Sequence, residues 1–246
     1  MSDVQKTVPS GVYAPLYTFF HEDEPLDLEA FKQHVKWVAS AGVGIVALGS
    51  SGEAVHLSHD ERREVLLAAR QVLDSDASLA AIPLIAGTPA SSTRETIELT
   101  RQAAECGADF AMVITPGYFA GALTRAAIKQ FFTDVAEASL FLDGAGCITG
   151  LANLAPKTCM KLYKATTEYL QSPTAEALDE VRRLQGIVSR GDWPVIKGGI
   201  AGPKYVLDRI RGYGGAPRRP LLPMEAKDGE KMLAALQEIL DHEKTL

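Results

Sequence analysis

Short apolar runs that alternate with amphipathic stretches limit most strongly how this chain can fold. Four such runs lie at 11–17, 42–48, 82–87 and 110–116. They recur about every thirty residues, and each is followed by a segment with apolar residues at helical spacing. Runs that are apolar throughout are typical of strands covered on both faces. Four strand–helix units in succession predict a parallel sheet with right-handed crossovers.

Capping residues mark where three of the helices begin. Ser58 with Glu61 and Ser92 with Glu95 each fit a capping box, in which the two side chains bond reciprocally to free backbone amides. Thr124 precedes a further apolar-periodic segment and is predicted to cap it. These signals support helices in the alternating pattern.

The second half of the chain contains more helix than strand. One further strand is predicted near 147–150. Helices are predicted over 155–169, 174–190, 203–211 and 224–244. Turn-rich joints are expected at 191–194 and 212–220. Five strands are fewer than the eight of a closed (β/α)₈ barrel, so a doubly wound five-stranded sheet remains an alternative on pattern alone.

The charge and the composition of the chain exclude several classes of binding partner. The net charge of −6 argues against nucleic acid, which needs a basic face. No apolar run approaches the roughly 18 residues of a membrane span. The first residues, Met-Ser-Asp-Val-Gln-Lys, lack the pattern of a targeting signal. Three widely spaced cysteines indicate reduced thiols rather than disulfides. We therefore expect a cytoplasmic protein that acts on a small molecule.

Candidate site residues follow the strand ends, where parallel α/β proteins bind ligands. Gly-Ser-Ser-Gly-Glu at 49–53 could cradle a carboxylate or a phosphate through the Ser50 and Ser51 hydroxyls and the loop amides. A polar turn without a ligand explains this loop equally well. Tyr118, just past the fourth strand, could relay a proton, although an aromatic residue at a barrel rim is the commoner case.

Other chemistries find little support in the residues. No histidines pair at metal-ligand spacing, so no metal site is expected. Ser50 and Ser51 lack the glycine on both sides that a strand–turn–helix nucleophile requires, which disfavours acyl transfer.

Several motifs together resemble one known family. They are Gly-Ser-Ser-Gly-Glu at 49–53 with Leu-Ser-x-x-Glu-Arg at 57–62, Gly-Ala-Asp at 107–109 with Thr-Pro-Gly-Tyr at 115–118, Gly-Ala-Gly-Cys-Ile-Thr-Gly at 144–150, and Ala-Asn-Leu-Ala-Pro at 152–156. In this order they resemble the dihydrodipicolinate synthase / N-acetylneuraminate lyase family of class I aldolases. The tail at 212–221 resembles the branch of 4-hydroxy-2-oxoglutarate and 2-keto-3-deoxy-L-galactonate aldolases.

The resemblance implies a (β/α)₈ barrel with a C-terminal helical segment, assembled as a homo-oligomer. It implies a lyase that forms a Schiff base between a strand-six lysine and pyruvate or a related 2-oxo acid, without metal or cofactor. Ser50 and Ser51 would hold the acid's carboxylate, and the Ile148 backbone would lie against it. Tyr118 would belong to a proton relay completed across a subunit interface.

The chain departs from the family by an internal deletion. Strands five to seven are missing, and the junction is predicted near 139–140, so the fold is a barrel lineage truncated to about five parallel βα units. Of the twelve lysines, only Lys197 resembles one carried on a strand, and the family match places it in the C-terminal helical region. No Schiff-base lysine is identified, and the helix lysines are expected to be solvated.

We therefore expect residues 1–160 to form a partial barrel domain and residues 161–246 a helical region. The predicted function is a 2-oxo-acid aldolase of this lineage, impaired because the lysine segment is absent. A non-catalytic 2-oxo-acid-binding relative, or a truncated isoform that associates with a full-length subunit, is the alternative. A five-stranded phosphate-binding enzyme is a third possibility.

Overall fold

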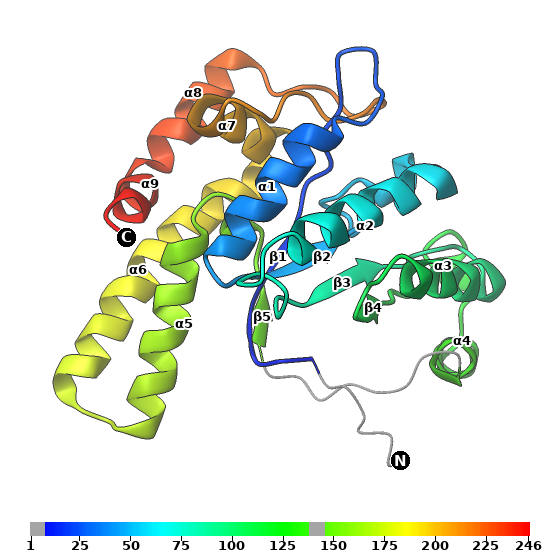
Figure 1. Cartoon of the computed structure of the whole chain (residues 1–246), viewed down its shortest axis with the longest axis horizontal. Coiled ribbons are helices and arrows are strands. Elements are labelled where there is room, and N and C mark those ends of the chain that lie inside the picture. The colour runs from blue at the N-terminus through cyan, green and yellow to red at the C-terminus, as the bar shows by residue number, and fades with distance from the viewer. Residues whose placement is uncertain (1–7, 138–145) are drawn as a thin grey trace.

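The protein is described by a computed structural model over residues 8–137 and 146–246 (Figure 1). The expected junction near 139–140 lies outside the described residues. The five strands are β1 (Gly11–Pro15), β2 (Gly44–Ala47), β3 (Leu84–Gly87), β4 (Phe110–Met112) and β5 (Gly146–Ile148). Strands β1 to β4 fall within the four apolar runs of the sequence, and β5 overlaps the strand predicted near 147–150.

The strands form one parallel sheet in the order β4-β3-β2-β1-β5. Tyr13 of β1 pairs with Gly44 on one side and with Ile148 on the other. The last strand therefore lies beside the first, as it does in a barrel whose strands follow in sequence order. Among the described residues, β4 and β5 are the outer strands.

The helices form a layer on one face of this sheet. They are α1 (Leu28–Ser40), α2 (His59–Asp74), α3 (Thr93–Glu105), α4 (Arg125–Glu137) and α5 (Pro156–Gln171). Each of α1 to α3 packs on the next helix, and α5 contacts β1 and lies beside the end of α1 (Figure 1). This arrangement is that of the outside of a barrel, because a doubly wound sheet carries helices on both faces. The doubly wound alternative is therefore wrong.

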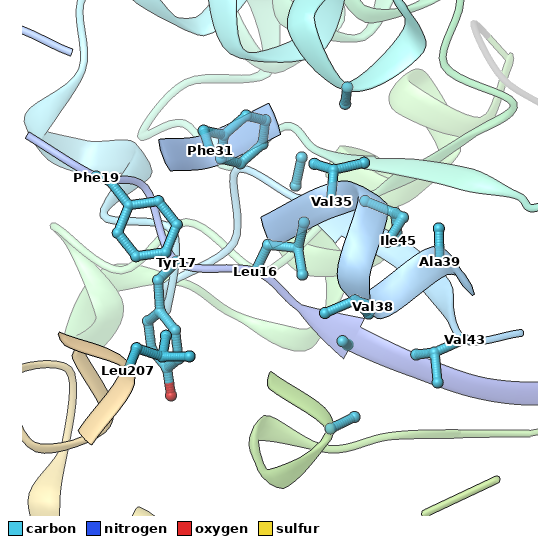
Figure 2. Packing of buried hydrophobic residues seen from close by; sticks show 14 of the residues in the cluster. Leu16, Tyr17, Phe19, Phe31, Val35, Val38, Ala39, Val43, Ile45 and Leu207 are labelled. Atoms are coloured by element: carbon cyan, nitrogen blue, oxygen red, sulfur yellow. The ribbon is translucent and has the colours of Figure 1, made fainter. Parts of the chain in front are cut away.

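The main core lies between the sheet and these helices. Phe31, Val35 and Val38 follow one stripe of α1 and face Ile45 of β2 (Figure 2). Successive strand residues point to opposite faces. On the other face, a smaller cluster is formed by Tyr13, Val46 and Ile85, with Val8, Phe110 and Met112 packed against it.

The predicted helix caps are formed with one exception. The Ser58 hydroxyl accepts from the Glu61 amide, and the Glu61 carboxylate accepts from the Ser58 amide. Ser92 likewise accepts from the Glu95 amide. The reciprocal bond predicted at this second box is absent among the described residues, because the Glu95 carboxylate turns to His59 Nε2 at 3.2 Å instead.

The C-terminal helices are α6 (Ala175–Gly198), α7 (Ala201–Arg211), α8 (Ala226–Ala235) and α9 (Gln237–Lys244). The joint predicted at 191–194 is wrong, since α6 continues through Pro194. Gly191 packs closely against Ile239, and Val195 is buried near Gly150, so tertiary packing overrides the helix-breaking residues. Helix α5 runs through residues 160 and 161, and the division into two domains there stays a prediction.

The ring of His34 links three segments of the chain. Its Nε2 lies 2.9 Å from Asn153 Oδ1, and its Nδ1 lies 3.1 Å from the Tyr213 hydroxyl oxygen. The Asn153 amide nitrogen donates to the carbonyls of Pro15 and Gly150, so Asn153 Oδ1 must accept from Nε2 and Tyr213 must donate to Nδ1. Burial lowers the pKa of His34 to about 4, which keeps this ring neutral.

This network predicts a loss of stability in mild acid. Between pH ~6.5 and 4 the unfolded chain binds a proton at His34 that the folded chain does not, so the free energy of unfolding falls as the pH falls through this window. The contribution present above pH ~6.5 is roughly 3 kcal/mol. We expect His34→Gln to flatten this part of the pH profile in urea unfolding. An identical slope in wild type and His34→Gln would contradict the assignment.

Candidate functional site

The loop after β2 has an unusual backbone. Leu48, at the end of the strand, has a φ of 63°, and Glu53 has a φ of 53°. Left-handed conformations are uncommon outside glycine, and for a bulky residue such as leucine they indicate strain. Strain of this kind persists where the surrounding structure enforces it and often marks a functional site. The short helix η1 (Ala54–His56) follows directly.

Several hydrogen-bond donors in this loop have no partners within the part of the chain that the structure describes. The hydroxyls of Ser50 and Ser51 contact no acceptor, and neither do the backbone amides of Ser50, Ser51 and Gly52. Ser50 is exposed and Ser51 is half-buried. Clustered amides and hydroxyls make a concave anion site. The loop can therefore receive a carboxylate or a phosphate.

Neighbouring groups hold the loop in place. The Thr18 hydroxyl donates to the Gly52 carbonyl at 2.7 Å. The buried guanidinium of Arg62 donates to the carbonyls of Ala54 and Gly87, which ties the loop to the end of β3. A Cβ atom on Gly87 would overlap the Leu48 carbonyl oxygen. The close approach of β3 to the loop thus requires glycine at this position.

A buried ion pair lies beneath the loop. Glu53 Oε1 accepts from Lys204 Nζ of α7 at 3.0 Å, and both side chains are fully buried. Glu53 Oε2 accepts from the backbone amide of Arg218 at 2.8 Å. Burial lowers the pKa of Lys204, and Glu53 opposes that shift. The C-terminal region is therefore bonded directly to the candidate site.

One lysine, Lys204, is buried although it was expected to be solvated. Lys204 was predicted to be solvated with the other helix lysines, and this is wrong, because α7 packs against the β2 loop. A buried carboxylate needs a cation, and Glu53 pairs with Lys204 at a separation of 151 residues. That requirement was the one signal for Lys204. Lys197 is exposed on α6, with Nζ 4.9 Å from the centre of the Trp193 ring.

Tyr118 and Ile148 lie on opposite sides of the loop. Tyr118 follows β4 and Ile148 ends β5, and three strands lie between these outer strands in the sheet. The Tyr118 side chain is 80% exposed and packs edge-on against Phe119. Ile148 is 51% exposed. The structure brings neither into contact with Ser50 or Ser51, and their roles stay predictions.

Metal and thiol chemistry gain no support from the geometry. Across residues 8–137 and 146–246, no three His, Cys, Asp or Glu side chains are grouped as metal ligands. Cys106 and Cys159 are buried. No described helix is long and apolar enough to span a membrane.

Comparison with known proteins identifies the lineage. A model of the "Dihydrodipicolinate synthetase family" matches residues 8–142, more than half of the chain. The chain belongs to this family. The match contains both the loop after β2 and Tyr118, and it ends close to the predicted junction.

Two fungal relatives match over nearly the whole chain. L-threo-3-deoxy-hexylosonate aldolase of Hypocrea jecorina is 32% identical, with 98% of this chain and 99% of the relative covered. The probable mitochondrial 4-hydroxy-2-oxoglutarate aldolase of Emericella nidulans is 31% identical, with 96% of each covered. The first alignment has 319 positions against 246 residues here, so at least 73 positions lack a residue in this chain.

The fold is shared with solved barrels. Dihydrodipicolinate synthase from Acinetobacter baumannii, solved as a pyruvate complex, superposes with a TM-score of 0.80 at 22% identity. The superposition covers 94% of this chain and 98% of that one. The five parallel units with their helical segment are thus a truncated form of the barrel, as the sequence predicts.

Crowding at Gly87 predicts a stability effect. Gly87→Ala should displace the Leu48 carbonyl and the start of the loop, at a cost of roughly 3 kcal/mol in the free energy of unfolding. Gly117→Ala is a matched control, because a Cβ there meets no atom within 4 Å. Urea unfolding measures both. Equal stability of the two variants would show that the loop does not press on β3.

Proposed function

We propose that this chain is a shortened class I aldolase that keeps the 2-oxo-acid carboxylate site of its family and lacks the Schiff-base lysine, so that carbon–carbon bond chemistry is impaired. The unpartnered donors of the loop after β2 carry this proposal. Two serine hydroxyls and three amides suit the planar carboxylate of pyruvate. The related synthase solved with pyruvate supports this choice of ligand.

The lysines argue for lost chemistry. A Schiff-base lysine must be neutral part of the time and within reach of the substrate. No described strand carries a lysine. Lys197 is exposed on α6 and is not carried on a strand. Lys204 is buried, but Glu53 occupies its amine and no solvent reaches it.

The length of the chain fits this interpretation. The fungal relatives match both ends of the chain, so their additional positions lie inside the alignment. The family match stops at residue 142, beside the junction predicted near 139–140. We infer that an internal segment with the missing strands, and with it the nucleophile, has been lost.

The alternative function is binding without chemistry, alone or within an assembly that contains a full-length subunit. The exposed aromatic rings of Tyr118 and Phe119 favour it, because apolar groups of this size usually mark a contact surface. Size-exclusion chromatography of the chain mixed with a full-length fungal relative separates the possibilities. A mixed species supports the assembly, and two unchanged peaks argue against it.

Trapping with borohydride tests the catalytic proposal. We expect no stoichiometric adduct after incubation with pyruvate and borohydride, because no described strand carries a lysine and Lys204 is buried against Glu53. Intact-mass measurement and peptide mapping provide the readout, with the full-length fungal relative as the positive control. A single adduct on one lysine, at Lys204 or Lys197 above all, would falsify the inactive interpretation. Scattered substoichiometric labelling would agree with it.

Pyruvate binding tests the carboxylate site. Without a covalent bond, only hydrogen bonds to one carboxylate hold pyruvate, and each hydrogen bond contributes about 1–3 kcal/mol. We therefore expect millimolar affinity at best. Ser51→Ala should weaken it by about tenfold, and exposed Ser189→Ala on α6 should not. NMR titration of the full chain measures both. Binding that is tight and insensitive to Ser51→Ala would show that the ligand lies elsewhere, and a preference for inorganic phosphate would favour a phosphate site.

A further inference from the structure

The ion pair beneath the loop has no role in the proposed chemistry, yet one of its members, Glu53, is the last residue of the candidate site. Both carboxylate oxygens of Glu53 are used. Oε1 accepts from Lys204 Nζ at 3.0 Å, and Oε2 accepts from the Arg218 amide at 2.8 Å and lies 3.3 Å from His56 Nδ1. Both of the donors distant in sequence come from the C-terminal region, 151 and 165 residues from Glu53.

These two donors are themselves firmly held. Lys204 Nζ lies 4.8 Å from the centre of the Phe20 ring, and the guanidinium carbon of Arg218 lies 4.4 Å from the same centre. Cations over an aromatic face are attracted by its quadrupole. Both terminal nitrogens of Arg218 also donate to the Glu61 carboxylate, and one reaches the Glu24 carbonyl. The donors therefore form a rigid support rather than a flexible tether.

The backbone of the loop needs such a support. Leu48 and Glu53 both have left-handed φ values, one at each end of Gly49 to Gly52. Conformations of this kind persist only where surrounding contacts over-determine them. Thr18 and Gly87 hold the loop from the sheet side. Contacts from the C-terminal side reach the loop through the Glu53 carboxylate.

We propose that Lys204 and Arg218 are positioning residues that set, through Glu53, the shape in which Ser50 and Ser51 receive the carboxylate of a 2-oxo acid. The ligand in this statement rests on the proposed function, whereas the positioning rests on the contacts themselves. The C-terminal region then tunes affinity for the acid without touching it.

The test uses Lys204→Met and the double variant Glu53→Gln/Lys204→Met in the full chain. Lys204→Met leaves the buried Glu53 carboxylate without its cation and should lower stability. The double variant removes both charges and should recover it. Three quantities are measured: stability by urea unfolding, Kd for pyruvate by NMR titration, and hydrogen exchange of the amides over residues 44–57.

Positioning predicts that affinity and stability separate. In both variants the Kd for pyruvate should rise by about tenfold and the loop amides should exchange faster, although the double variant is as stable as wild type. Leu184→Ala is the control, since it removes a buried side chain from α6. Measured well below its unfolding midpoint, it should lose stability and keep both affinity and loop exchange.

The outcomes distinguish this inference from the proposed function. The positioning role is overturned if the affinity for pyruvate changes in parallel with stability across all variants. It is also overturned if the loop amides of the double variant exchange hydrogen at the same rate as those of the wild type. If wild type binds no pyruvate, the proposed function fails, and loop exchange alone then decides whether positioning stands. If Lys204→Met does not fold, the double variant carries the same test.

Discussion

The contact between Glu53 and Lys204 constrains the structure more than any other described interaction. Burying the charges of Glu53 and Lys204 away from water costs free energy, and removing one of them leaves the other uncompensated. Such a pair forms only when α7 lies against the β2 loop, within reach of 3.0 Å. The position of the C-terminal helices is thus coupled to the shape of the loop. Arg218 strengthens this coupling through its backbone amide and its contact with Glu61.

The sheet provides the rigid frame for that loop. Because β2 lies between β1 and β3, its carboxyl end is supported from both sides, and Leu16 and Gly87 approach the loop closely. One layer of helices covers one face (Figure 1). A smaller apolar cluster occupies the other face. This is the local order of a barrel wall. The wall keeps its geometry although the fungal relatives have many more positions between the same ends.

Much of this was predictable from the sequence, and the parts that were not have a common cause. Strands, caps at Ser58 and Thr124, and the loop at 49–53 depend on local patterns and were found. Helix α6 continues through Pro194 because distant side chains bury it. The turn of Glu95 toward His59 and the burial of Lys204 likewise depend on partners far away in sequence. Single-sequence patterns contain no information about such contacts. Tyr118 was singled out by its position after a strand, whereas Ile148 came only from the family resemblance.

The large sequence separation within the ion pair also bears on how the chain is made. Synthesis proceeds from the N-terminus, and domains tend to fold as they emerge. The first four strands and the Glu53 loop are complete long before Lys204 leaves the ribosome, as is β1 before its neighbour β5. Until then the Glu53 carboxylate must remain hydrated, which keeps the loop open and the early core unsealed. Contacts of high sequence separation slow folding. The nascent chain therefore completes the loop after β2 only in the last stage of translation, when the C-terminal helices arrive.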